Sequence, residues 1–230
     1  MAGIISLRTI IGCVFLEKTQ LFVKFILSWW DTNRRNFPWR RTTNAYRLLI
    51  TEVLLRKTTA KQVSSIYAEF FKNYSTINEL AETEVDELEK ILYPLGMEKK
   101  RSKELSKIAN FIVEEYNGKI PSEMDKLMDL YGVGRYTASG VLCQAYKKDH
   151  AMVDTNVIRV MGRYFGFKSS KKRPRDDPKL WSFTTALIPK GKCKEFNLGL
   201  IDFAGDICNF RSPKCDLCKI NEYCNYFKTN

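Results

Sequence analysis

Apolar residues recur at helical spacing along most of this 230-residue chain, whereas the alternating pattern of a β-strand is weak throughout. The spacing predicts helices at residues 17–30, 45–58, 61–73, 85–92, 99–116, 135–146, 180–188 and 196–206. Two further helices are expected, one ending near Leu130 and one beginning at about Asp154. The chain is therefore predicted to be an all-α protein, and its sequence contains no internal repeat.

Two glycines around a valine, Gly132, Val133 and Gly134, separate the helix that ends near Leu130 from the helix at 135–146. Glycine accepts the positive φ angles of a tight turn, so these residues predict a helical hairpin with Val133 in the core. The backbone N–H groups of such a turn lie at a helix N-terminus, where they suit an anion such as a DNA phosphate. Taken alone, the three residues also fit an ordinary interhelical turn.

Basic residues outnumber acidic ones by 38 to 26, which gives a net charge of +12. Nucleic acid is the first candidate for a polyanionic partner, although an anionic membrane surface would also satisfy the electrostatics. No apolar run approaches the roughly 18 residues that cross a bilayer, and the N-terminal segment has no clear signal-peptide cleavage site. A cytoplasmic, nucleoid-associated protein is expected. The single histidine, His150, excludes most histidine-based triads and zinc sites.

Four of the seven cysteines fall within the last 23 residues, with the spacing C-x₆-C-x₂-C-x₅-C at Cys208, Cys215, Cys218 and Cys224. An odd number of cysteines, crowded in this way, favours a metal site over a disulfide framework. Four thiolates suit a tetrahedral zinc ion or a [4Fe–4S] cluster. A common four-cysteine zinc site pairs two C-x-x-C segments, and only one is present here.

Two carboxylates stand out from their surroundings. Asp154 follows the apolar run 151–153 and is expected at a helix N-terminus, where the ordinary role of an aspartate is to cap the helix. Glu52 lies among apolar residues of the predicted helix at 45–58, and a buried charge there is costly unless it has a partner. From periodicity alone, an exposed or salt-bridged glutamate remains an alternative.

The combination of these features is more specific than any one of them. The segments L-x-G-V-G-x-Y-T-A and V-D-T-N-x-x-R-V resemble the helix-hairpin-helix and catalytic-aspartate segments of the endonuclease III superfamily of DNA glycosylases. The segments FPWR, ITEVLLRKTTA, GKCKEFNLGLIDF and the cysteine spacing resemble its thymine-DNA (G/T) mismatch branch. The resemblance extends from Phe25 to Cys224, with one departure: Tyr131 stands where the family usually has proline.

The resemblance implies two helical domains with a DNA-binding cleft between them. A six-helix barrel with the hairpin is expected at residues 45–150. Residues 1–44 and 151–230 are expected to form the second domain, which would hold a [4Fe–4S] cluster on the four C-terminal cysteines.

The resemblance also implies which residues contact the partner, double-stranded DNA that contains a mismatch. Contacts are expected from Gly132, Val133, Gly134 and Arg135 in the hairpin, and from Lys57, which would begin a loop inserted into the duplex. The target base must leave the stack to be reached, and a mispaired base costs less to extrude. The protein is expected to act as a monomer.

The implied chemistry is hydrolysis of the N-glycosidic bond of thymine or uracil opposite guanine. Asp154 would stabilise the cationic sugar and orient the attacking water. Glu52 would handle protons or bind the base. Tyr136 occupies the position where bifunctional relatives carry a lysine that forms a Schiff base, and a phenol cannot form an imine. A monofunctional glycosylase that leaves an abasic site is therefore expected.

Two alternatives remain open at this stage. An adenine glycosylase shares Glu52, Asp154 and the cluster, but usually has a small residue at the position of Tyr136 and a further C-terminal domain. A non-catalytic helix-hairpin-helix DNA-binding protein would explain the charge and the hairpin, but it gives no reason for the two carboxylates to occur together.

Overall fold

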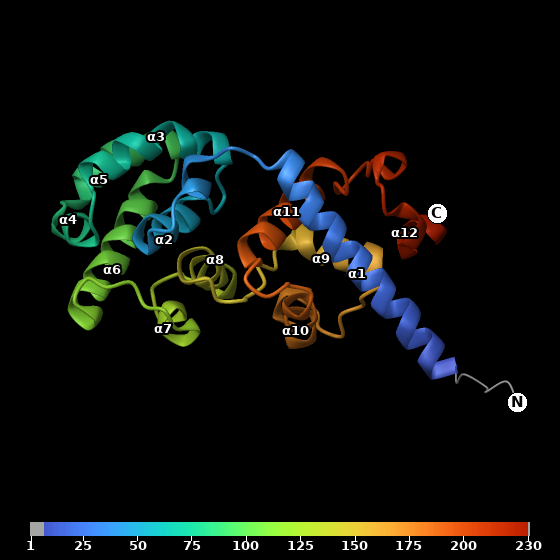
Figure 1. The fold of residues 1–230 in the computed structure, drawn as a ribbon. Coiled ribbons are helices and arrows are strands. Elements are labelled where there is room, and N and C mark those ends of the chain that lie inside the picture. The colour runs from blue at the N-terminus through green and yellow to red at the C-terminus, as the bar shows by residue number, and fades with distance from the viewer. Residues whose placement is uncertain (1–6, 230) are drawn as a thin grey trace, which may run out of the picture. The chain divides into compact units, whose positions relative to one another are not determined.

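The computed structural model describes the backbone of residues 7–229 and the side chains of residues 15–229. Every regular element in this part of the chain is a helix, and no β-strand occurs in it (Figure 1). The predicted all-α fold is confirmed. None of the helices described is both long enough and apolar enough to cross a membrane. The chain forms two compact units, a split unit (residues 1–35 and 151–230) and a continuous unit (residues 36–150).

The continuous unit contains seven α-helices between residues 36 and 150, where the sequence predicted six. The additional helix is α4, which is only six residues long and begins after Thr76, whose side chain accepts a hydrogen bond from the backbone of Glu79 at 3.2 Å. A helix this short cannot establish a period in the sequence. The seven are α2 (Ala45–Leu54), α3 (Ala60–Asn73), α4 (Ile77–Glu82), α5 (Val85–Leu92), α6 (Glu98–Tyr116), α7 (Met124–Met128) and α8 (Arg135–Tyr146).

One hydrophobic core holds the continuous unit together. Helix α2 packs against α8, and α6 runs alongside α4 and α5. Leu49 of α2, Phe70 of α3, Leu105 of α6 and Leu142 of α8 are all fully buried in this core. Removing such a side chain from water contributes roughly 1.5–3 kcal/mol. Helices α2 and α8, which carry the two expected catalytic residues of this unit, are therefore held in fixed register.

Residues 36–44 belong to the continuous unit, whereas the expected division at residue 45 assigned them to the other domain. Trp39 in the 3₁₀ helix Pro38–Arg41 is buried in the core of this unit. Its ring stacks on Phe37 with centroids 4.8 Å apart and packs against Tyr67 at 5.8 Å. The core that these aromatic residues join is set by tertiary packing, which the segment FPWR does not reveal.

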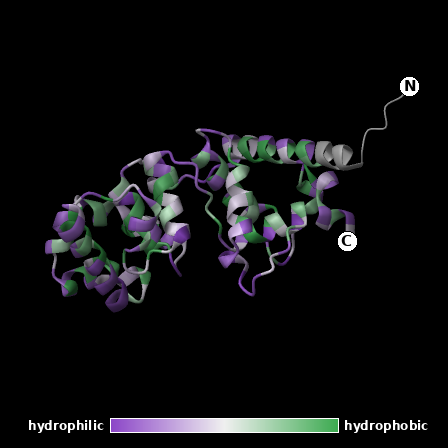
Figure 2. Ribbon diagram, turned by 90° about the horizontal axis from the view of Figure 1, so that it is seen from below, coloured by the Kyte–Doolittle hydropathy of each residue, from purple (hydrophilic) through white to green (hydrophobic). Residues whose placement is uncertain are grey.

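The split unit contains α1 (Leu7–Asn33), α9 (Thr155–Phe165), α10 (Pro178–Ala186), α11 (Cys193–Asp206) and α12 (Asn225–Thr229). Helix α1 packs against α11, and Figure 2 shows apolar and polar positions mixed around α1, as expected for a helix with one face on a core. Phe22 and Ile26 are fully buried. A Cβ atom at Gly199 would lie 2.9 Å from the backbone oxygen of Ile26, so only glycine permits this close approach of the two helices.

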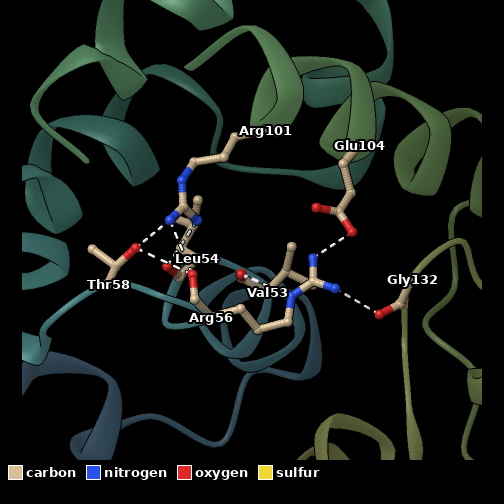
Figure 3. Close-up of polar contacts among 7 residues, drawn as sticks. All are labelled: Val53, Leu54, Arg56, Thr58, Arg101, Glu104 and Gly132. Carbon is tan, nitrogen blue, oxygen red and sulfur yellow. Dashed lines mark hydrogen bonds and ion pairs between the residues drawn. The ribbon is translucent and has the colours of Figure 1, made fainter. Parts of the chain in front are cut away.

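Helix α2 ends at Leu54, although the apolar pattern predicted a helix to residue 58. The buried guanidinium group of Arg101, on α6, donates hydrogen bonds to the carbonyl oxygens of Leu54 (3.1 Å) and Arg56 (3.0 Å) and to the side chain of Thr58 (Figure 3). These acceptors lie at a frayed helix end, where carbonyl groups lack helical partners. Lys57 takes a left-handed conformation with φ of 56°, which breaks the helix.

Candidate functional site

The predicted helical hairpin is present between α7 and α8. Gly132 has a φ of 70°, which favours glycine, while Val133 is buried and its N–H donates to Leu130 at 3.0 Å. Gly134 has a φ of −101° and precedes α8 as its N-cap residue, without a side-chain hydrogen bond. The two glycines therefore serve different purposes, because only Gly132 requires the conformational freedom of glycine.

Side chains from outside the hairpin hold its turn in place. Arg56 donates from Nη1 to the carbonyl oxygen of Gly132 at 2.6 Å and also forms an ion pair with Glu104 of α6 (Figure 3). The ammonium group of Lys107, one turn further along α6, lies 4.6 Å from the ring centroid of Tyr131. These two contacts restrain the turn on both sides of the Tyr131–Gly132 peptide bond.

Glu52 is buried in α2 and forms no salt bridge with the residues described. Among the described residues, the one hydrogen-bond partner of its carboxyl group is Gln144 of α8, whose Nε2 lies 3.4 Å from Oε1 of the glutamate. Burial raises the pKa of Glu52 from its ordinary value of 4.5 to about 7, against the opposing effects of the Gln144 hydrogen bond and the positive charge of Arg40. The sequence alternative of an exposed or salt-bridged glutamate is therefore excluded.

The raised pKa of Glu52 predicts how stability depends on pH. The folded state binds the carboxyl proton of Glu52 more tightly than the unfolded state does. The resulting contribution to the unfolding free energy is complete below pH 4.5 and is lost as the pH rises through about 7. Relative to wild type, Glu52→Gln is expected to gain about 3 kcal/mol in unfolding free energy between pH 4.5 and pH 8. Urea unfolding of both proteins across this range measures the difference, and parallel profiles would contradict the assignment.

Tyr136 lies in the first turn of α8 and is partly buried, next to the exposed Arg135. Helices α2 and α8 pack against each other, so the continuous unit carries Glu52, Tyr136, the hairpin residues and Lys57. The other expected site residues, Asp154 and the four cysteines, belong to the split unit.

Asp154 caps the N-terminus of α9, as its position in the sequence predicted. Its Oδ1 atom accepts hydrogen bonds from the backbone N–H groups of Asn156 (2.9 Å) and Val157 (2.8 Å). Its Oδ2 atom accepts one from the side-chain amide of Asn156 at 2.8 Å. The carboxylate is partly buried and held in a single orientation by three donors. Capping and catalysis are compatible roles, because a carboxylate fixed at a helix N-terminus is already oriented to stabilise a positive charge that develops in a transition state.

Asn156 and Arg159 support Asp154, although no role was predicted for either from the sequence. Arg159 donates from Nη1 to the side-chain oxygen of Asn156 at 3.0 Å, which fixes the orientation of that amide. Its other nitrogens donate to the backbone oxygens of Cys208 and Ala204, both at 2.8 Å. The i to i+3 spacing of Asn156 and Arg159 on a helix was available in the sequence. Their connection to residue 208 was not, since it depends on tertiary packing.

Cys208, Cys215, Cys218 and Cys224 line one cavity of the split unit. Arg163 of α9 lines it as well, with Nη1 at 3.7 Å from the sulfur of Cys208 and at 2.7 Å from the backbone oxygen of Asn209. Within the described part of the chain, no group of three or more His, Cys, Asp or Glu side chains is gathered closely enough to hold one metal ion. The cavity therefore collects four thiols without arranging them as the ligands of a single ion.

Comparison with known proteins identifies the family. Residues 50–183, more than half of the chain, match the family of HhH-GPD superfamily base excision DNA repair proteins. The chain belongs to the HhH-GPD superfamily. This confirms the resemblance found in the helix-hairpin-helix and aspartate segments.

Relatives of this HhH-GPD protein match over nearly its whole length. A thymine/uracil-DNA glycosylase of Methanothermobacter thermautotrophicus is 41% identical over 92% of this chain and 96% of its own length. The solved structure of a thermostable thymine-DNA glycosylase superposes with a TM-score of 0.90 at 40% identity, covering 94% of this chain and 99% of that one. By contrast, an adenine DNA glycosylase of Buchnera aphidicola is 29% identical, and this chain covers only 58% of its length.

Proposed function

We propose that this HhH-GPD protein is a monofunctional DNA glycosylase that hydrolyses the N-glycosidic bond of thymine or uracil mispaired with guanine. The near full-length similarity to a thymine/uracil-DNA glycosylase carries the proposal for the substrate. The surroundings of Asp154, Glu52 and Tyr136 support the reaction. Its product would be DNA with an abasic site.

Asp154 is assigned to the sugar. Cleavage of the N-glycosidic bond builds positive charge on the deoxyribose, and a carboxylate fixed by three hydrogen bonds stabilises that charge without reorganising. The same oxygen atoms can orient the attacking water. Asn156, held by Arg159, is the positioning residue for this carboxylate.

Glu52 is assigned to proton transfer with the departing base. A pKa of about 7 means that the protonated and ionised forms are both populated near neutral pH, as a general acid or base requires. Tyr136 supplies a phenol, which is protonated at this pH and cannot form a Schiff base with the sugar. The absence of an amine at this position is the reason for proposing hydrolysis alone.

The hairpin is assigned to a DNA phosphate, and its two glycines provide a test. A Cβ atom at Gly132 would overlap the Glu104 carboxylate, in addition to the strain of a positive φ, whereas nothing lies within 4 Å of a Cβ atom at Gly134. Gly132→Ala is expected to lower the unfolding free energy by about 1–3 kcal/mol. Gly134→Ala is expected to leave stability unchanged and to weaken duplex binding, because its methyl group would occupy the space of the phosphate. Chemical denaturation and fluorescence anisotropy measure the two effects, and equal destabilisation by both variants would contradict this division of roles.

The four cysteines of the cavity are proposed to hold a [4Fe–4S] cluster. The donor set fits, because four thiols face one space and Arg163 lies beside it to offset the negative charge of the thiolates. A cluster bound by these four cysteines would cross-link residues 208–224. Protein purified without oxygen is expected to be brown and to contain about four iron atoms per chain. Stoichiometric zinc without iron, measured by elemental analysis, would reject the cluster.

Release of free base from a panel of duplexes tests the proposed function. G·T and G·U mismatches are expected to be processed, while A·G and A·8-oxoguanine pairs and matched duplex are expected to remain intact. Release of adenine would favour the adenine-glycosylase alternative. Tight binding without release of any base would favour a non-catalytic DNA-binding protein.

A further inference from the structure

A positively charged hollow lies beside Lys57, the residue with the left-handed backbone conformation, and neither Glu52 nor Asp154 lines it. Four of its lining residues are cationic and one is anionic, and its volume is about 140 Å³. A water molecule takes up about 30 Å³ in the liquid, so the hollow has room for a group several times that size. The residues that line this Lys57 hollow are Val53, Arg56, Lys57, Met97, Lys100, Arg101 and Glu104.

Arg101 places an unpaired positive charge behind the Lys57 hollow. Its side chain is only 5% exposed, yet its hydrogen bonds go to carbonyl and hydroxyl oxygens, and it forms no salt bridge with the residues described (Figure 3). Burial and the nearby charge of Arg56 lower the pKa of Arg101, against the opposing effect of the Glu104 carboxylate, which is already paired with Arg56. Buried charges are normally paired because desolvation is costly. An anion in the hollow would supply the missing negative charge.

The remaining lining charges divide into one engaged pair and two free ammonium groups. Arg56 and Glu104 neutralise each other, and Arg56 is held further by the carbonyl oxygens of Val53 and Gly132. Lys57 and Lys100 are exposed, and the ammonium group of neither has a hydrogen-bond or ion-pair partner in the described part of the chain. The backbone of Lys57 is strained, and strain of this kind persists only where the surrounding structure imposes it. Here Arg101 imposes it, because its hydrogen bonds hold the residues on both sides of Lys57.

We propose that the Lys57 hollow is a second phosphate-binding site, which takes one phosphodiester group of the DNA backbone through the ammonium groups of Lys57 and Lys100. Arg101 and the Arg56–Glu104 pair form its rigid wall, and Arg56 connects this wall to the hairpin turn. Two separate phosphate contacts would fix the orientation of the protein on the duplex, which a single contact cannot do. This inference rests on the proposed function only in taking DNA as the ligand.

The test is the salt dependence of binding to a fully matched duplex, which requires no base excision. Each lost phosphate contact lowers the slope of log K against log salt concentration by about 0.9. Lys57→Gln and Lys100→Gln are each expected to lower the slope by this amount, and the double variant by about twice as much. Lys99→Gln and Lys103→Gln are matched controls, because these lysines are exposed neighbours on α6 that do not line the hollow. They are expected to keep the wild-type slope.

The outcomes separate this site from the proposed function. Slopes for Lys57→Gln and Lys100→Gln that equal those of the two control variants would overturn the site, whether or not the protein excises a base. Reduced slopes in a protein that releases no base from any mismatch would support the site and reject the glycosylase. A wild-type protein that does not bind duplex DNA would reject both.

Discussion

Asp154→Asn is expected to slow base release about a thousandfold while leaving duplex binding close to that of wild type. Asparagine is as good an N-cap as aspartate, and its oxygen can still accept the backbone N–H groups of Asn156 and Val157. The fold of α9 is therefore preserved while the negative charge that the cationic sugar requires is lost. Single-turnover excision from a G·T duplex, with enzyme in excess, measures the chemical step directly.

Asp177→Asn is the matched control for this substitution. Asp177 also caps a helix of the split unit, with an oxygen 2.9 Å from the backbone nitrogen of Lys179, but has no assigned role in the reaction. It is expected to show the wild-type excision rate. If Asp154→Asn retained that rate as well, another group would have to stabilise the cationic sugar, and Glu52 would be the first candidate to test.

Tyr136→Lys is expected to create a new activity, namely a covalent bond to the DNA sugar and strand cleavage. The substitution places an amine at the position where the resemblance to bifunctional glycosylases predicts one, while Asp154 and Glu52 remain. The amine must be neutral to attack the anomeric carbon. Partial burial and the neighbouring charge of Arg135 would lower the pKa of this lysine and so favour its neutral form. Borohydride reduces the imine and traps the adduct, which is then detected as a shifted band on a denaturing gel.

Tyr131→Lys serves as the control for an amine that is simply added to this surface. Tyr131 lies in the hairpin turn and is 53% exposed, so a lysine there changes the charge equally. It is expected to give no adduct. An adduct with the wild-type protein would contradict the monofunctional assignment. If Tyr136→Lys folds and binds DNA but gives no adduct, residue 136 does not face the sugar.

The sequence was most informative where one helix carries the signal and least informative where distant residues decide. The apolar periodicity predicted the first and last residues of α6 and α8 to within one position, because each helix buries a long stripe of its own residues. The end of α2 was predicted wrongly, since it is determined by Arg101, more than 40 positions further along the chain. The segment 36–44, which contains Trp39, was assigned to the wrong unit for a similar reason.

The candidate site shows the same division. Asp154, Glu52 and the hairpin glycines are recognisable because each lies in a short motif with a local physical meaning. The pairing of Gln144 with Glu52 joins two helices 92 positions apart. The contact of Arg159 with the backbone of Cys208 joins segments 49 positions apart. Neither pairing leaves a period or a spacing that could be read from the sequence alone.

The close packing of Gly132, Arg56 and Glu104 has a consequence for how this chain can evolve. Because a side chain at position 132 would occupy the space of the Glu104 carboxylate, the two positions cannot change independently. A relative that loses glycine at 132 must move or shorten the side chain at 104, and Arg56 then loses its ion-pair partner. These three positions should therefore covary among homologues, as a group that is inherited or replaced together.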